Sequence, residues 1–366
     1  MIKKLDWYIL KKFLTTTIFM VLIFSLISVV IDTSEKTDEF VKSGLSLYEI
    51  LTQYYAGFVP FIISMIFPLM VFIAVILFTS KMAGRSEIIA ILAGGVSFNR
   101  MLRSYLIGAF ILGGGFWLAN QYLIPRANIL RGNFQARYID SESSYEKQEY
   151  YKKRRDYYYR LNADTYAGMR NYDSTTRTAR SGFFMERVKD GKVIYNLRAD
   201  NIRWDTSTNN WEMTNVVERK LDGIKEQISH TQSRNIDLSM RPEEIEDKYL
   251  KDKMTTPKLV SFINAEESKG TEGLNNYKVE RYRRDATPFS VLLLTIMGAI
   301  IASRKTRGGS GLHLAVGIII AALFVVMDKF SLTFSTKSNF SPVLAAWMPN
   351  IIFAFVTVFI YRTAPK

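Results

Sequence analysis

The side chains that could do chemistry are few in this chain. It contains no cysteine, which excludes disulfides, thiolate metal sites and thiol catalysis. Its two histidines, His230 and His313, have no other metal-ligating residues at a useful spacing. The phosphate-binding pattern G-x-x-x-x-G-K-[ST] is absent, and the glycine-rich stretch 308–311 lacks the lysine. The sequence therefore predicts no catalytic, cofactor or metal site, and no ATP hydrolysis by this chain alone.

One carboxylate, Glu87, nevertheless lies at the predicted start of a short helix that could contact a partner. Glu87 follows Ser86, which can cap a helix, and a carboxylate suits the positive end of a helix dipole. Apolar residues follow at helical spacing, and Gly94 and Gly95 end the segment. We expect a short amphipathic helix at about residues 85–94. From the residues alone, docking into a groove of a partner protein and lying on the lipid surface fit this helix equally well. The candidate interface residues are Arg85, Ser86, Glu87, Ile88, Ile91 and Leu92.

Six apolar stretches surround this segment and a long polar insert. They run from Phe13 to Ile31, Phe58 to Ser80, Leu102 to Ile124, Thr287 to Ser303, Leu312 to Met327 and Val343 to Tyr361. Crossing about 30 Å of hydrocarbon takes roughly 20 residues of helix. The first and sixth stretches contain no charge, which argues against buried helices of a soluble protein. The mean hydropathy of +0.02 conceals this pattern because the polar insert dilutes it.

The charges predict an orientation. The formal net charge is +14, which alone could suggest nucleic-acid binding. However, the basic clusters sit at alternate ends of the apolar stretches, as in the positive-inside rule. Two of these clusters are Lys3, Lys4, Lys11 and Lys12, and Lys81, Arg85, Arg100 and Arg103. We therefore expect both termini in the cytoplasm, the insert outside, and no nucleic-acid partner.

The insert has the pattern of an antiparallel β domain. Short β-prone runs alternate with turn signals, including Asp190-Gly191 and Asp222-Gly223. Such spacing favours a sandwich, a jellyroll or an open barrel. The expected organisation is three membrane helices in residues 1–125, the β domain with a terminal helix in 126–285, and three membrane helices in 286–366.

Several segments together resemble the lipopolysaccharide export permease family (LptF/LptG), and the opening is closer to the LptG type. The resemblance covers essentially the whole chain. It is carried by Leu5-Asp6-Trp7-Tyr8-Ile9, Phe67-Pro68, Arg85-Ser86-Glu87-Ile88, Ala93-Gly94-Gly95, Ala199-Asp200-Asn201-Ile202-Arg203-Trp204, Trp211-Glu212-Met213-Thr214-Asn215, Met254 to Gly270, and Pro288-Phe289.

The resemblance implies a periplasmic β-jellyroll on six helices of the bacterial inner membrane. It implies a second LptF/LptG-type permease, a dimeric cytoplasmic ABC ATPase that engages Glu87 and its helix, and periplasmic jellyroll bridge proteins that receive lipopolysaccharide. The first and fifth membrane helices would form a side gate. Lipid-phosphate contacts would fall to Lys36 and Lys42, because the rest of that region reads Asp32-Thr33-Ser34-Glu35.

Two other classes stay open at this point. One is the membrane subunit of a transporter for another lipid or for lipoproteins. The other is a membrane-anchored sensor or scaffold, for which the chain offers no cytoplasmic signalling module.

Overall fold

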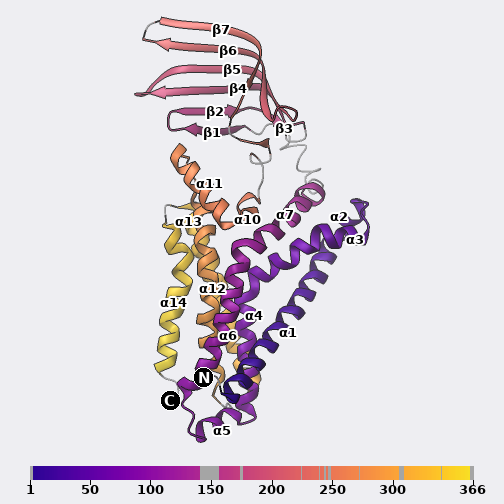
Figure 1. The fold of residues 1–366 in the computed structure, drawn as a ribbon, viewed down its shortest axis with the longest axis vertical. Helices are drawn as coiled ribbons and strands as arrows, with labels where there is room; N and C mark the ends of the chain where they lie inside the picture. Colours follow the sequence, from indigo (N-terminus) through magenta and orange to yellow (C-terminus); the bar gives the residue numbers. More distant parts are fainter. Residues whose placement is uncertain are drawn as a thin grey trace. The chain divides into compact units, whose positions relative to one another are not determined.

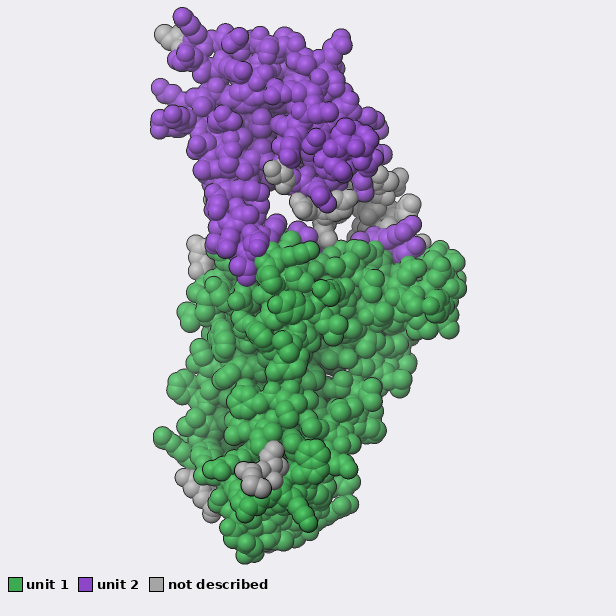
Figure 2. All heavy atoms as spheres, in the orientation of Figure 1, with its two compact units in different colours: residues 1–135, 252–259, 275–366 green, residues 136–251, 260–274 purple. Residues whose placement is uncertain are grey.

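The structure is a computed structural model. It describes residues 3–140, 156–173, 176–223, 225–238, 240–242, 245, 249–271, 273–304, 309–338 and 340–362. Two compact units divide the chain: unit 1 comprises residues 1–135, 252–259 and 275–366, and unit 2 comprises 136–251 and 260–274 (Figure 2).

Unit 1 is helical. The chain's helices are α1 (Lys4–Glu35), α2 (Thr37–Lys42), α3 (Leu47–Ile50), α4 (Ala56–Gly84), α5 (Glu87–Ala93), α6 (Phe98–Leu118), α7 (Ile124–Phe134), α10 (Leu250–Lys253), α11 (Thr256–Lys269), α12 (Asn275–Ala302), α13 (Gly309–Lys337) and α14 (Pro342–Arg362) (Figure 1). Single π-helical turns at Leu51–Tyr55 and Ala119–Leu123 join α3 to α4 and α6 to α7, and a third at Gln135–Ile139 follows α7.

Six helical segments are long and apolar enough to cross a membrane. They are Lys4–Glu35, Leu47–Gly84, Phe98–Ile139, Asn275–Ala302, Ser310–Lys337 and Pro342–Arg362. Three precede the inserted sheet and three follow it, so the predicted fold class is confirmed. The third helical segment continues well beyond Ile124, where the apolar pattern ends. It does so because Asn128 and Arg131 of α7 are buried rather than exposed, where α7 packs on α4.

Close backbone approach holds the helices of unit 1 together. Gly57 of α4 lies against α7 so tightly that an added Cβ would stand 2.6 Å from the Arg131 backbone nitrogen. Pro60 and Pro68 lie inside α4, and such residues are tolerated where neighbouring helices compensate the lost hydrogen bonds. The main apolar cluster joins α1, α4, α5, α6 and α12, with Phe13, Phe78 and Tyr105 stacked at its centre. This cluster sets the position of α5.

Unit 2 is built on one antiparallel sheet. Its strands are β1 (Tyr157–Asn162), β2 (Thr165–Met169), β3 (Tyr172–Asp173), β4 (Thr178–Lys189), β5 (Lys192–Asp205), β6 (Asn210–Asp222) and β7 (Lys225–Ile236). The order is β1-β2-β4-β5-β6-β7, with β3 paired to β4 (Figure 1). Except for β2 and β4, between which the two-residue strand β3 intervenes, neighbours along this order are consecutive in the sequence, as hairpin connections require.

The predicted turns lie where the sequence indicates. Asp190 and Gly191 both have positive φ and connect β4 to β5, as a two-residue hairpin turn requires. Asp222 pairs with Lys225 at the hairpin that connects β6 to β7. The core of unit 2 is centred on Trp211, which is fully buried, packs against Trp204 at 5.3 Å between ring centroids, and donates its indole N–H to the Met240 carbonyl at 2.9 Å.

Candidate functional site

The segment between α4 and α6 folds as a short helix, α5, at one end of unit 1 (Figure 1). Gly95 has a φ of 83° and ends the helix, as predicted. The capping prediction for Ser86 is wrong: it adopts a left-handed conformation with φ of 60° and makes no side-chain capping hydrogen bond. Only two residues separate α4 from α5, and the chain can change direction over so few residues because Ser86 adopts the left-handed conformation. Ser86 therefore acts through its backbone, whose carbonyl accepts from the Ala90 N–H at 3.0 Å.

Glu87 is held by α1. Its Oε2 accepts a hydrogen bond from the Tyr8 hydroxyl at 2.9 Å and forms an ion pair with Lys12 Nζ at 3.2 Å. Lys12 also donates to the Tyr8 hydroxyl and lies 4.2 Å from the centre of its ring. Partial burial raises the pKa of Glu87, but the hydrogen bonds from Tyr8 and Lys12 and the Lys12 charge outweigh it, so this pKa lies below its usual value. We call these three side chains the α1–α5 latch.

A second polar contact joins α1 to α6 beside the latch. Asp6 accepts a hydrogen bond from the Ser104 hydroxyl at 3.2 Å and lies 3.6 Å from the Arg100 guanidinium. Two contacts therefore fix α5 to α1. One is made by Glu87, the first residue of α5, and the other by α6, the helix that follows α5. Neither contact could be predicted from the sequence, because the partners are separated by 75 or more positions.

The apolar stripe of α5 faces inward. Ile88 is buried, and Ile91 and Leu92 pack against the main apolar cluster of unit 1. The exposed surface of α5 is formed instead by Ile89, which is 52% exposed, together with Ala90, Ala93 and the neighbouring Arg85. Sequence reasoning missed Ile89 because a three-residue stripe does not say which side of a short helix meets the protein core.

The two lysines considered for lipid phosphate follow the end of α1 that is remote from α5. Lys36 is paired with Asp32 of the preceding turn and donates to the Tyr54 hydroxyl, which itself donates to Asp32 at 3.1 Å. Its charge is therefore largely neutralised within the fold. Lys42, at the end of α2, is exposed. The structure does not bring the two lysines into one pocket among its described cavities.

A small apolar pocket of about 230 Å³ lies among α4, α12, α13 and α14. Two polar pairs border it: Arg283 and Asp328 at 3.1 Å, and Ser290, which donates to Asn350 at 2.7 Å. Asn350 also donates to the Ala286 carbonyl at 2.8 Å, so its amide is satisfied on both sides. Arg283 and Asp328 are 45 positions apart in the sequence, so their pairing depends on the packing of α12 against α13.

The first and fifth spans are the least buried of the six. Only 11% of the most apolar window of α1 is buried, against 22% for α13 and 67% for α12. Large apolar side chains such as Leu22 and Leu26 of α1, and Ile319 and Phe330 of α13, are more than half exposed. These helices present long apolar faces that a single copy of the chain leaves uncovered.

Within the described residues, no group of three or more histidine, aspartate or glutamate side chains could hold a metal ion. His313 is engaged with the Arg304 carbonyl at 2.8 Å, and His230 is exposed on β7. The described part of the chain consists of six helical segments long enough to cross a membrane, a short helix bonded to α1, and a sheet in a separate unit.

Comparison with known proteins shows which family has this arrangement. Residues 7–363 match a family described as "Lipopolysaccharide export system permease LptF/LptG". No curated protein matches the chain. Members of this family are transport subunits without catalytic activity of their own. The match spans nearly the whole sequence and both units, and the chain belongs to the lipopolysaccharide export permease family LptF/LptG.

Proposed function

We propose that this chain is one permease half of an ABC-type lipopolysaccharide exporter, and that α5 is the element through which a separate ATPase drives it. The observation that carries the proposal is the α1–α5 latch. A surface helix that merely capped the bundle would not need its first carboxylate bonded to another membrane helix. Through Glu87, a displacement of α5 is passed directly to α1.

The ATPase contact is assigned to the side of α5 that the fold leaves open. Arg85 and Ile89 are exposed there, while Glu87 is about a quarter exposed and can meet a basic group of the partner beside Lys12. The buried Ile88 and the partly buried Ile91 and Leu92 attach α5 to its own helical bundle. By the positive-inside pattern, α5 and both termini face the cytoplasm and the sheet of unit 2 faces the periplasm.

The lipid path follows from the exposed helices. Exposing one acyl CH₂ group to water costs about 0.8 kcal/mol, so a lipid with several acyl chains does not leave a bilayer unaided. The uncovered apolar faces of α1 and α13 are suited to meet a second LptF/LptG-type permease, and to separate from it so that lipid enters sideways. The jellyroll bridge proteins would then continue the path from the edge of the sheet in unit 2, where β7 is the last of the described strands.

The test is Glu87→Gln, which removes the charge and keeps the shape. In the reconstituted exporter we expect weaker co-purification of the ATPase and less lipopolysaccharide released per ATP hydrolysed. Glu39→Gln is the matched control, since this carboxylate lies on α2, far along the chain from α5. Unchanged ATPase recovery and release in Glu87→Gln would overturn the assignment of α5.

A further inference from the structure

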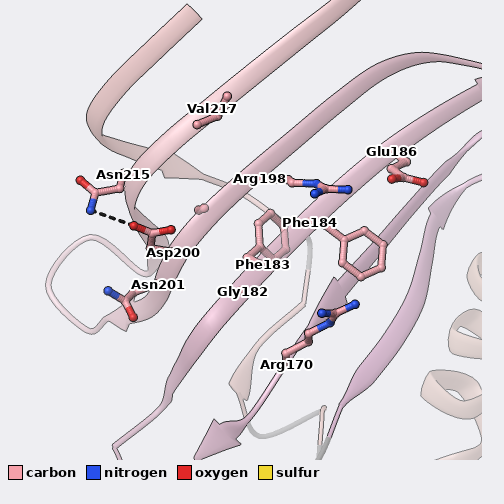
Figure 3. A pocket seen from close by; sticks show the side chains of 11 residues that line it. Arg170, Gly182, Phe183, Phe184, Glu186, Arg198, Asp200, Asn201, Asn215 and Val217 are labelled. Atoms are coloured by element: carbon pink, nitrogen blue, oxygen red, sulfur yellow. Dashed lines mark hydrogen bonds between the residues drawn. The ribbon is translucent and has the colours of Figure 1, made fainter.

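A pocket of about 720 Å³ opens on the sheet of unit 2, over β2, β4, β5 and β6 (Figure 3). Its lining mixes cationic, anionic and amide side chains with the ring of Phe184. The polar members are Arg170, Glu186, Arg198, Asp200, Asn201 and Asn215. Such a lining is unsuited to an acyl chain, because burying unpaired charges beside hydrocarbon is costly.

The pocket exists because adjacent strands are distorted at the same level. The pairing of β4 with β5 shifts register between Arg180 and Phe183, and Gly182 there has a φ of 133°. On β6, Asn215 has a φ of 53°, a conformation that asparagine tolerates better than most residues. Asn215 donates to the Asp200 carboxylate at 3.0 Å, which fixes this wall of the pocket (Figure 3).

Two guanidinium groups flank the Phe184 ring. Arg198 pairs directly across the strands with Phe184, and Gly168 pairs with Phe184 from the other side. Arg170 is two residues after Gly168, just past the end of β2, and its side chain lies on the same face (Figure 3). In Figure 3 the Phe184 ring lies between the two guanidiniums. Phe184 fits there because Gly168 has no side chain: an added Cβ would stand 2.6 Å from the ring's Cζ.

Both arginines are exposed, and neither side chain has a hydrogen bond or ion pair among the described residues. The nearby carboxylates are otherwise engaged: Glu186 accepts from Asn196 at 2.8 Å, and Asp200 accepts from Asn215. A guanidinium presents donors in a planar fork that matches phosphate and carboxylate oxygens. Two such forks beside an aromatic ring and amide groups suit a ligand with an anionic group and a ring bearing hydroxyls.

We propose that this pocket binds a phosphorylated saccharide, with Arg170 and Arg198 donating to the phosphate oxygens and Phe184 packing against the sugar ring. Asn201 and the carboxylates accept from hydroxyl or ammonium groups of the sugar. The ligand can be the headgroup of a glycolipid or a free sugar phosphate. The inference deepens the proposed function, and it rests on that function only where the glycolipid is the source.

The test measures binding to the full chain in its purified complex, by saturation-transfer NMR. The probes are glucosamine 1-phosphate, glucosamine and inorganic phosphate. We expect glucosamine 1-phosphate to bind at least tenfold more tightly than either of the other two. The double variant Arg170→Gln/Arg198→Gln should lose at least tenfold of that affinity, since charge-assisted hydrogen bonds to phosphate are the strong ones. The matched control is Arg219→Gln, an exposed arginine on β6 that is paired with Glu226 at 3.5 Å and lies outside the pocket.

Competition by nanodiscs containing lipopolysaccharide separates the two sources. Displacement of glucosamine 1-phosphate from the wild-type chain, and loss of nanodisc binding at this site in the double variant, supports the glycolipid headgroup. Retention of the probe supports a free sugar phosphate. Glu87 is not part of the pocket, so Glu87→Gln should bind glucosamine 1-phosphate as tightly as the wild-type chain even where it fails to recover the ATPase. A failure of the α5 proposal is therefore seen separately from a failure of this one. Equal binding of glucosamine and glucosamine 1-phosphate, or undiminished binding by the double variant, overturns the proposal.

Discussion

The geometry of the α1–α5 latch predicts how much the interaction between Glu87 and Lys12 contributes to the free energy of unfolding. Their charged atoms are 3.2 Å apart, and their side chains are 26% and 33% exposed. At an effective dielectric constant of about 20, the Coulomb attraction at this distance is about 5 kcal/mol. Desolvation and solvent screening remove most of it, and fully exposed pairs retain only about 0–1 kcal/mol. A charge-assisted hydrogen bond with this partial burial should therefore contribute about 1–2 kcal/mol.

A double-mutant cycle tests that figure. The variants are Glu87→Gln, Lys12→Met and the two combined, and methionine keeps an unbranched apolar stem against Tyr8. We expect each single variant to lower the free energy of unfolding by about 1–2 kcal/mol and the double variant to lower it little further. The measurement is reversible unfolding of the purified chain in mixed detergent micelles. Lys11→Met is the control, because Lys11 is the exposed neighbour of Lys12.

The same variants show whether the α1–α5 latch transmits motion from α5 to α1 or only stabilises the fold. If the latch transmits motion, Lys12→Met should lower lipopolysaccharide release per ATP hydrolysed while the ATPase still binds through Arg85 and Ile89. If the double variant loses as much unfolding free energy as the two single variants together, within about 0.3 kcal/mol, then Glu87 and Lys12 do not interact and the latch is refuted. An intact coupling energy with an unchanged release ratio would refute its role in transmission.

Three further outcomes follow from other contacts. Gly57→Ala should destabilise unit 1 by about 2–4 kcal/mol in the same unfolding assay, since the new methyl group would overlap the backbone of α7, whereas Gly114→Ala should be within about 1 kcal/mol of wild type because open space surrounds it. The lowered pKa of Glu87 means that the latch contributes stability above its usual value of 4.5 and loses it as pH falls through the lower folded-state value, so the stability difference between wild type and Glu87→Gln should vanish in acid. Trp211→Phe should cost unit 2 about 1–3 kcal/mol in thermal unfolding followed by circular dichroism, because it leaves the Met240 carbonyl without its donor and opens a cavity.

The sequence predicted the parts of this molecule that obey local rules. Apolar length indicates six membrane helices, and Asp190-Gly191 indicates a hairpin whose two central residues both have positive φ. In each case the information lies within one segment, so periodicity or turn chemistry is sufficient. The extension of the third span through α7 was missed because Asn128 and Arg131 are polar, and their burial depends on α4.

Prediction was weakest where partners are distant in the chain. The sequence marked Glu87 by its place at a helix start, yet its binding to Tyr8 and Lys12 depends on the packing of α1 against α4 and α6. The role of Lys36 in binding lipid phosphate stays a prediction, and the sequence did not show that the π-helical turn before α4 brings Tyr54 to Lys36 and to Asp32. Which side of α5 faces outward was likewise decided by the apolar cluster beneath it.

The contacts of α1 are concentrated at its two ends, and this bears on how an ATPase stroke could reach the opposite side of the membrane. Near its start, Asp6, Tyr8 and Lys12 bind α5 and α6, and near its end Asp32 binds Lys36 and Tyr54. Between them, most large side chains are exposed. A continuous helix of this length spans about 48 Å and has few ways to shorten. Tilting at the α5 end must therefore shift the far end or the exposed middle of α1. Under the proposed function, lipid or a second permease would lie against that middle. A tilt of α1 would then open a path for lipid along its middle while its two ends stay bonded to their neighbours.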